Sequence, residues 1–418
     1  MKEYFHSVRL DSALCKGCTT CVKRCPTEAI RVRDKKATIT SERCVDCGEC
    51  IRVCPEHAKK AVVDSLDILK NYEYTVALPA PTLYGQFQNL DDRNYILTAL
   101  KRIGFDDVFE VSVAADAVSA AMHMELMAKR IPHPIISSAC PAVLRIICVR
   151  FPSLLPHLFD YRSPMELAAR WGRRLAIKKT GLPADKIGCI FISPCPAKST
   201  SVKNPIDNTR SPIDAVVSIS EVYPKLLAAI KKIETPETLV QSGAIGVGWA
   251  ISGGEGAAAM EPNHLAASGV ENTIRILEAL EDDKLTDVDL IELNSCGPGC
   301  VGGVLTVENP FIARSRIQTL MRRIGPVLPT DGCPVEDMRW EGKVDFEPVL
   351  MLDPDVHVAM SKYDRINELQ ERFNGMDCGA CGAPSCRALA EDIVQGYSNE
   401  DQCIFIVREK LQKLIDNQ

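Results

Sequence analysis

The sequence LIELNSCGPGCVGG, residues 290–303, decides the fold of the central part of this chain. The apolar run Leu290–Leu293 predicts a buried strand that leads directly into a loop carrying Cys296 and Cys300. Glycines around both cysteines allow the backbone to approach a bulky inorganic ligand closely. Two thiolates at this spacing can bind two corners of one metal cluster, so a four-thiolate site needs two further cysteines from elsewhere in the chain.

Length and composition narrow the class of protein. The 418 residues predict two or three domains, and the net charge of −6 gives no electrostatic reason to expect nucleic acid binding. No apolar run reaches about 18 residues and the first ten residues do not resemble a signal peptide, so we expect a cytoplasmic protein that does not enter a membrane. Nineteen cysteines in a reducing compartment indicate metal binding rather than disulfides.

The first 65 residues contain two copies of the motif C-x2-C-x2-C-x3-C-P. In bacterial ferredoxins with this motif the fourth cysteine of each copy binds the other cluster. The predicted ligands are Cys15, Cys18, Cys21 and Cys54 for one 4Fe–4S cluster, and Cys44, Cys47, Cys50 and Cys25 for the second. A zinc module is the alternative, but the two Cys-Pro endings favour an α+β ferredoxin-like domain over residues 1–65.

Residues 66–352 alternate short apolar runs with amphipathic stretches, which is typical of an α/β domain with largely parallel strands. The predicted strands are Thr75–Leu78, Pro134–Ser137, Ile187–Ile192, Ala215–Ile219 and Leu290–Leu293. The predicted helices include Ala114–Ala128, Met165–Lys178 and Thr273–Leu280. Ligands of parallel sheets sit beyond the carboxyl ends of the strands, and two strand ends lead into Cys140 and Cys195, which supply the missing thiolates.

A glycine-rich segment and three lone cysteines of the central region are predicted to have structural roles. The glycine-rich segment 243–254 lacks the ending of a phosphate loop, so close backbone packing around a buried cofactor is favoured. Cys148, Cys189 and Cys333 have no partner at ligand spacing and are expected to be buried apolar residues.

Residues 353–418 form the third predicted domain. Apolar residues three or four apart predict a helix over residues 356–373, which Gly375 ends. The cysteines that follow, Cys378, Cys381, Cys386 and Cys403, predict a third conventional 4Fe–4S cluster. Zinc is the alternative metal for this module.

The three cysteine loops of the central region together resemble the active-site domain of iron-only (FeFe) hydrogenases. Their sequences here are SSACP at 137–141, SPCPAK at 193–198 and ELNSCGPGC at 292–300, and the segment VALPAP at 76–81 is similar to the family's first active-site strand and turn, which includes Pro79. The resemblance implies an H-cluster, a 4Fe–4S cubane joined to a diiron subcluster with CO, cyanide and a dithiolate. The cubane ligands would be Cys140, Cys195, Cys296 and Cys300, with Cys300 bridging to the diiron subcluster and Lys198 donating to a cyanide.

The resemblance also implies an activity and its partners. The activity is reversible H2 oxidation and proton reduction, with electrons relayed by the 4Fe–4S clusters. The partners are H2, protons, a redox partner such as ferredoxin or a signalling protein, and maturation proteins that supply the diiron subcluster.

Several positions depart from the family pattern. The family's relay cysteine is Ala139 here, its relay carboxylate and serine are Met122 and Phe159, and Glu125 is the one relay-like carboxylate left. Methionines of the second and third loops are replaced by Ser193 and Asn294. These changes, together with the C-terminal cysteine module, are similar to the sensory-type branch and predict slow turnover. Many proteins of that branch carry a further sensor or signalling domain, and this sequence stops at Gln418 without one, so we do not expect direct signal output.

Two other functions compete with a hydrogenase. The first is a hydrogenase-like scaffold without diiron chemistry, as in the relatives that serve iron–sulfur protein assembly. The second is an ordinary electron carrier, which leaves the large domain around four cysteines unexplained.

Overall fold

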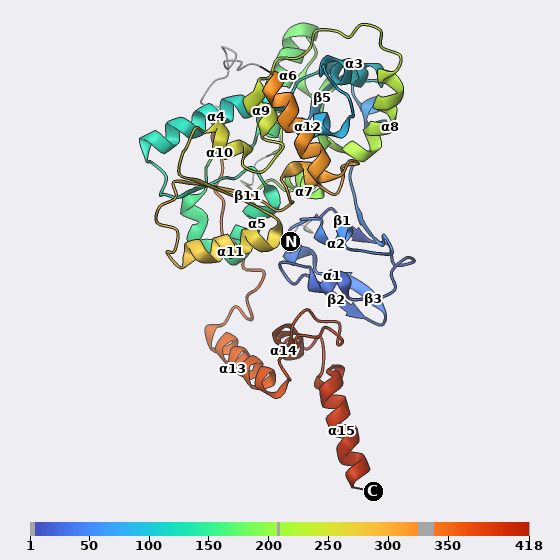
Figure 1. The fold of residues 1–418 in the computed structure, drawn as a ribbon. Coiled ribbons are helices and arrows are strands. Elements are labelled where there is room, and N and C mark those ends of the chain that lie inside the picture. The colour runs from blue at the N-terminus through green and yellow to red at the C-terminus, as the bar shows by residue number, and fades with distance from the viewer. Residues whose placement is uncertain (1–4, 207–209, 325–337, 418) are drawn as a thin grey trace. The chain divides into compact units, whose positions relative to one another are not determined.

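The computed structural model describes residues 5–206, 210–324 and 338–417, and they form two compact units (Figure 1). Residues 1–44, 49–61 and 347–418 make up the terminal unit, and residues 45–48 and 62–346 make up the central unit. Cys333 lies outside the described residues. Within the described ranges, no helix is both long and apolar enough to cross a bilayer.

The central unit contains two parallel sheets. The first has the order β6-β5-β8-β9 and the second the order β10-β11-β7. Their strands are β5 (Tyr74–Pro79), β6 (Asp107–Val108), β7 (Ile135–Ile136), β8 (Ile187–Ser193), β9 (Ala215–Ser218), β10 (His264–Ser268) and β11 (Leu290–Asn294). The α/β class is confirmed. Strands β6 and β10 were not predicted, because β6 has two residues and β10 has no continuous apolar run.

Helices pack on both sheets and bury the apolar faces that the sequence pattern indicates. They are α3 (Asn94–Arg102), α4 (Val111–Ala128), α5 (Pro141–Arg150), α6 (Pro164–Thr180), α7 (Pro196–Lys203), α8 (Ile219–Ile230), α9 (Ala244–Gly248), α10 (Gly254–Ala258), α11 (Val270–Glu281) and α12 (Pro310–Arg323). Local signals fix their ends: α6 begins with a capping box between Ser163 and Glu166 and ends at Gly181, which has a φ of +73°. Helices α4 and α6 share a core with β5 and β8.

A buried ion pair ties α3, α4 and the segment before α9 together. Arg93 Nη1 donates to Glu110 Oε1 at 3.0 Å, and both side chains are almost fully buried. The second oxygen of Glu110 accepts the backbone N–H groups of Gln241 and Ser242, and Tyr84 donates its hydroxyl to the first. The pair therefore holds the segment that leads to α9 and to Trp249.

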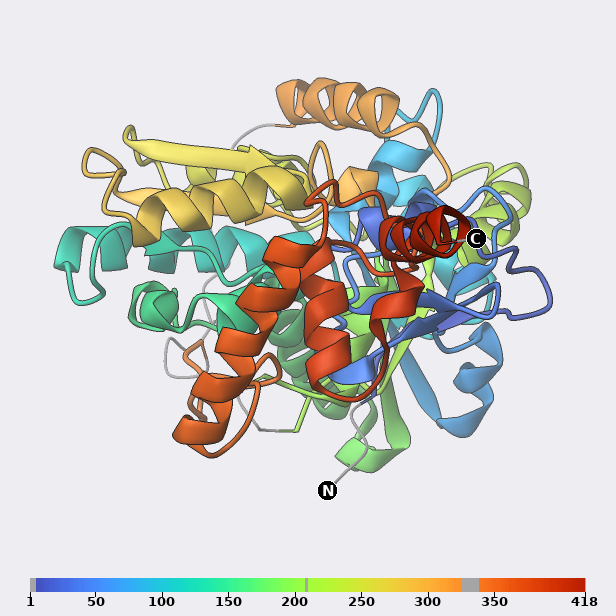
Figure 2. The same ribbon diagram turned by 90° about the horizontal axis from the view of Figure 1, so that it is seen from below.

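The terminal unit contains the first cysteine region and the C-terminal helices. Strand β1 (Val8–Leu10) pairs antiparallel with β4 (Lys59–Ala61), and β2 (Ile30–Arg33) forms a hairpin with β3 (Lys36–Ile39). Its helices are α1 (Thr20–Lys23), α2 (Glu49–Arg52), α13 (Val356–Arg372), α14 (Cys386–Val394) and α15 (Ile404–Asp416). Figures 1 and 2 show α13 beside α14, where Ile366, Leu369 and Leu389 share a core. The helix predicted over residues 356–373 is confirmed.

Removing one partner of the buried ion pair should destabilise the central unit strongly. Arg93→Ala leaves the Glu110 charge uncompensated, so we expect a loss of about 3–5 kcal/mol of unfolding free energy. Circular dichroism melting of the purified protein measures this as a lower midpoint temperature. Lys101→Ala is the control, because Lys101 lies on α3, the helix that Arg93 precedes as N-cap residue, and pairs with the more exposed Glu237. Equal shifts in the two variants would contradict a special role for the Arg93–Glu110 pair.

Candidate metal centre

The carboxyl ends of strands from both sheets deliver the central cysteines to one place. Cys140 follows β7 and is the N-cap residue of α5, and Cys195 follows β8 and is the N-cap residue of α7. Cys296 and Cys300 lie in the loop after β11, and Cys300 opens a short 3-10 turn that ends at Gly302. Helix N-termini favour negative charge, so two of the four sulfurs lie where an anionic cluster is stabilised.

Glycines in the third loop permit its close approach to neighbouring backbone. Gly299 has a φ of +106°, and a Cβ there would lie 2.4 Å from the Ser252 nitrogen. A Cβ at Gly303 would lie 2.2 Å from the carbonyl oxygen of Pro194, the residue before Cys195. The second and third cysteine loops can therefore lie against each other only because no side chain stands between them.

The burial of the central cysteine thiols favours metal binding. Burial is the largest effect on Cys195 and Cys300 and raises the pKa of each thiol to about 12, although the charge of Lys198 opposes the rise. Each of these two thiols also interacts with that of Cys140. The Ser295 hydroxyl lies 3.6 Å from the Cys140 sulfur and 3.8 Å from the Cys296 sulfur. Neutral buried thiols gain their charge when they bind metal, so the donor set fits a 4Fe–4S cubane.

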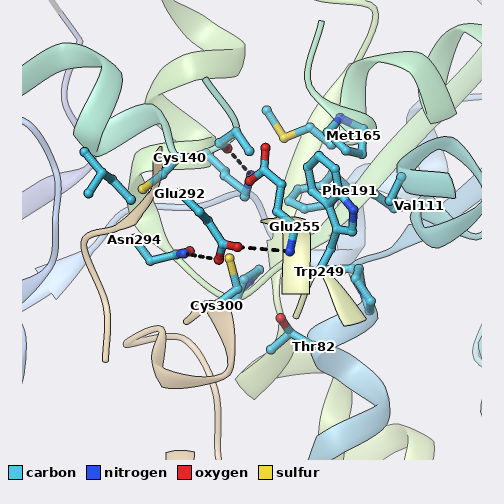
Figure 3. Close-up of a pocket in the computed structure, with 18 residues that line it drawn as sticks. Thr82, Val111, Cys140, Met165, Phe191, Trp249, Glu255, Glu292, Asn294 and Cys300 are labelled. Carbon is cyan, nitrogen blue, oxygen red and sulfur yellow. Dashed lines mark hydrogen bonds between the residues drawn. The ribbon is translucent and has the colours of Figure 1, made fainter. Parts of the chain in front are cut away.

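A small cavity lies beside these cysteines, and Lys198 is one of the residues that line it. It encloses about 60 Å³, and Cys140 and Cys300 form part of its wall. Figure 3 shows Cys140, Cys300, Glu292 and Asn294 on one side and Val111, Met165, Phe191 and Trp249 on the other, with Glu255 between them. The ammonium of Lys198 donates to the Ala139 carbonyl at 3.4 Å. A cation with spare donors here fits an anionic ligand such as cyanide on the predicted diiron subcluster.

Glu292 fixes the wall of the cavity through four hydrogen bonds. Its oxygens accept the backbone N–H groups of Gly253, Glu255 and Gly256 at 2.9–3.0 Å. The Asn294 side-chain amide also donates to Glu292, at 2.9 Å. Burial raises the pKa of Glu292, while these donors oppose the rise, so Glu292 is the better stabilised anion of the two glutamates at the cavity.

Glu255 is a buried carboxyl group of the opposite kind. Burial, followed by the charge of Glu292, raises the pKa of Glu255 to about 8. Ser137 is its side-chain hydrogen-bond partner, and its Oε1 atom has none among the described residues. A carboxylic acid that is protonated near neutral pH and lines the cavity can donate and accept protons there.

The structure does not bring Glu125 to this cavity. Burial opposes the ionisation of Glu125, but hydrogen bonds and charges from Arg130 and Arg339 hold its pKa below the usual value. Met122 and Phe159, which the resemblance placed at the family's relay positions, are buried apolar residues. The relay carboxylate predicted from the sequence is therefore part of an ion cluster, and Glu255 occupies the position beside the cysteines.

Three other residues predicted from the sequence lie at or next to the cavity and the cysteine loops. Ala139 lines the cavity, while Pro79 ends β5 just before the lining residues Ala80 and Pro81. The Ser193 hydroxyl donates to the Cys195 carbonyl at 2.9 Å and accepts from its N–H, so Ser193 shapes the second cysteine loop.

The terminal unit assembles two further cysteine groups. Four cysteines line one cavity, namely Cys15, Cys18, Cys21 and Cys54. At the C-terminal end, three of the four predicted ligands interact electrostatically, namely Cys378, Cys381 and Cys403, and the last also interacts with Cys386. Of the second ferredoxin set, Cys25, Cys44 and Cys50 belong to the terminal unit and Cys47 to the central unit.

The lone cysteines among the described residues are buried, and the glycine-rich segment 243–254 packs closely, as predicted. Cys148 and Cys189 are fully buried. In the glycine-rich segment, a Cβ at Gly246 would lie 1.9 Å from the Ser112 carbonyl oxygen, so the segment packs directly on α4. Asp116 accepts the N–H groups of Gly243 and Gly246.

Sequence reasoning missed Ser295 and Glu255 as site residues. Ser295 gave no signal, because serine between a strand and a glycine loop is ordinary. Glu255 gave a weak signal, since it is an acidic residue among glycines and alanines in a segment expected to pack tightly.

Three known protein families match this chain, one in each of the three cysteine-containing regions. Residues 73–260 match the family described as iron only hydrogenase large subunit, C-terminal domain. Residues 7–55 match the 4Fe-4S dicluster domain, and residues 374–405 match a domain described as a putative Fe-S cluster.

Individual relatives include hydrogenases and assembly factors. The periplasmic [Fe] hydrogenase large subunit of Nitratidesulfovibrio vulgaris is 29% identical over 212 residues, 46% of this chain and 50% of that protein. Iron hydrogenase 1 of Clostridium pasteurianum is 28% identical over 147 residues, 34% of this chain and 25% of that protein. A cytosolic Fe-S cluster assembly factor of Emericella nidulans is 36% identical over 83 residues, 20% of this chain and 14% of that protein. The chain thus spans no more than half of the length of these relatives.

Among solved structures, a variant of the [FeFe]-hydrogenase HydA1 from Chlamydomonas reinhardtii aligns over 59% of this chain and 83% of its own, with 17% identity and a TM-score of 0.45. The hydrogenase match over residues 73–260 includes the loops that carry Cys140, Cys195 and Lys198, and iron–sulfur domains match on both sides of it. The central region of this chain is therefore similar to the C-terminal domain of iron-only hydrogenase large subunits.

Proposed function

We propose that this chain is a sensory-type iron-only hydrogenase that catalyses slow, reversible H2 oxidation and proton reduction at an H-cluster in the central unit. The observation that carries the proposal is the cavity where Cys140 and Cys300, from two of the loops, meet Lys198 and the neutral carboxylic acid Glu255. An electron carrier needs only the cysteines, whereas chemistry on a small molecule needs the cavity and its proton-transferring group.

Each residue has a role in this function. Cys140, Cys195, Cys296 and Cys300 would hold the cubane, and Cys300, which lines the cavity, would be the cysteine nearest to the diiron subcluster. The bound diiron subcluster supplies the metal site at which H2 is formed or split. Lys198, which lines the cavity, would orient the subcluster by donating a hydrogen bond to one of its anionic ligands.

Glu255 replaces the lost relay as the proton-transferring group. As an acid it donates a proton into the cavity during H2 formation, and as a carboxylate it accepts one during H2 oxidation. Burial keeps Glu255 protonated near neutral pH, and Glu292 adds to this effect because two negative charges in one buried site repel each other. Phe191 and Met165 keep bulk water from the other side of the cavity.

Electrons leave or enter through the ferredoxin-like clusters. The loop Val45–Gly48, which carries Cys47, packs within the central unit. There Val45 is buried against the core beside Cys140, and Asp46 accepts from the Thr200 hydroxyl at 2.7 Å. We propose a cytoplasmic redox partner, either a ferredoxin or a signalling protein, and loading of the diiron subcluster by maturation proteins.

A scaffold without diiron chemistry is the second candidate, because a cytosolic Fe-S cluster assembly factor is among the similar proteins. Such a scaffold gives no reason for Lys198 and a neutral Glu255 to line the same cavity.

Infrared spectroscopy decides between the two functions. After anaerobic reconstitution and loading with the diiron subcluster, we expect bands from iron-bound CO and cyanide, because the cavity offers Cys300 and Lys198 to that group. A Lys198→Ala variant should show shifted or weaker cyanide bands, since it lacks the donor. If the parent protein shows no such bands after loading, the hydrogenase proposal is wrong and the scaffold function is the one that is supported.

Removal of one central ligand should separate the clusters. Cys195→Ala should lose the central cubane, about four irons, and keep the electron paramagnetic resonance signals of the other clusters. Cys189→Ala is the matched control, because Cys189 lies on β8, the strand that leads to Cys195, and is buried without lining the cavity. Loss of all cluster signals together in Cys195→Ala would contradict independent sites.

Replacing the proton-transferring group should lower activity without removing the cofactor. We expect Glu255→Gln to decrease H2 formation about 10²-fold or more, while the infrared bands persist. In the parent protein, H2 formation that depends on Glu255 as an acid should fall as the pH rises through about 8, and H2 oxidation should rise. The glutamine variant should lack this transition.

The control for that prediction is Glu125→Gln, the same substitution at the carboxylate in the ion cluster. It should keep the parent's pH dependence per loaded site. A loss of activity in Glu125→Gln with normal activity in Glu255→Gln would return the relay role to Glu125.

A further inference from the structure

The C-terminal cysteine loop of the terminal unit is seated directly on strand β2. The Val32 N–H donates to the Gly382 carbonyl at 2.9 Å. Gly382 has a φ of +79°, and a Cβ there would lie 1.8 Å from the Val32 carbonyl oxygen. Only glycine permits this approach, so the loop between Cys381 and Cys386 is shaped to contact the ferredoxin-like segment.

Two cations of the ferredoxin-like segment reach the carbonyl groups of this loop. Lys23 Nζ donates to the Pro384 carbonyl at 3.0 Å, and Arg33 Nη1 donates to the Cys381 carbonyl. The Lys23 side chain also runs close to Gly379, where an added Cβ would lie 2.7 Å from its Cε atom. Both positive charges therefore lie beside the loop that bears three of the four predicted ligands.

An ion pair to α14 holds one of these cations in place. Arg33 Nη2 lies 2.9 Å from Asp392 Oδ2, and Arg31 Nε lies 2.7 Å from the same oxygen. Asp392 is mostly buried, and its helix begins at Cys386. Arg31 Nη1 donates to the carbonyls of Glu28 and Ile30 in its own segment. Arg31 therefore anchors Asp392 without contacting the cysteine loop.

Carboxylates near the loop are bound to other groups. Glu28 accepts from the Ser385 hydroxyl at 3.2 Å, and burial raises the pKa of Glu28, which reduces its negative charge. Asp377 accepts the Cys386 N–H at 2.5 Å, and Glu391 pairs with Arg43. Lys23 has no carboxylate partner among the contacts described for it, so its charge acts on the loop.

We propose that Lys23 and Arg33 of the ferredoxin-like segment set the reduction potential of the 4Fe–4S cluster held by the C-terminal cysteines. A cluster on four thiolates is anionic, and reduction adds one more negative charge. Nearby cations stabilise the reduced form more than the oxidised form, so they raise the potential. The C-terminal cluster is thus tuned by its docking on the ferredoxin-like segment, a property beyond the hydrogenase function proposed above and independent of the diiron subcluster.

The test is a redox titration of the full-length, anaerobically reconstituted protein, followed by electron paramagnetic resonance. The signal of the C-terminal cluster is the one that Cys403→Ala removes. We expect Lys23→Gln and Arg33→Gln each to lower the ratio of reduced to oxidised C-terminal cluster about tenfold at a fixed potential, a shift of about 59 mV for one electron. The potential of the central cluster, whose four cysteines belong to the other unit, should stay unchanged.

Two controls separate charge from structure. Arg33→Lys keeps the charge and should retain most of the parent's potential. Arg31→Gln removes an equal charge and one bond to Asp392 but no contact with the cysteine loop, so its shift should be smaller. An unshifted C-terminal signal in Lys23→Gln and Arg33→Gln, an equal shift of every cluster, loss of the cluster's iron in both variants, or one bound zinc in place of the cluster would each overturn the proposal.

Discussion

The desolvation of the cysteine thiols in the central unit is the constraint on which the rest of the site depends. Cys195 and Cys300 have pKa values raised to about 12, so these sulfurs stay protonated until a metal replaces the proton. The surrounding structure meets this requirement with helix N-termini at Cys140 and Cys195 and with loops that approach each other through glycines. The parallel sheets are needed because their carboxyl ends bring three distant loops to one point.

The same low-polarity environment gives the two cavity glutamates different properties. Glu292 is stabilised as an anion by three backbone N–H groups and Asn294, whereas Glu255 has few partners and remains a neutral acid near pH 7. Asn294, which stands where the family has a methionine, therefore supports the charge of Glu292. Apolar side chains stand at Met122 and Phe159, whereas the acid Glu255 lines the cavity beside the cysteines.

Charge also organises the terminal unit. Its C-terminal cysteine loop is held by backbone contact with β2 and by the Arg31 and Arg33 pairs to Asp392, which are mostly shielded from solvent. Shielded pairs resist screening by salt, so they can fix the orientation of one cysteine module on another. The N-terminal and C-terminal parts of the sequence thereby form one compact unit.

The sequence by itself determined the α/β class, the five main strands and the cysteine groups, because strand periodicity and ligand spacing are local properties. Cysteines at the ends of predicted strands also indicated which loops share one cluster. The tertiary structure alone decided that Glu125 lies in an ion cluster with Arg130 and Arg339 and that Glu255 lines the cavity. The protonation of a carboxyl group depends on burial and on charges distant in sequence, and these exist only once the chain has folded.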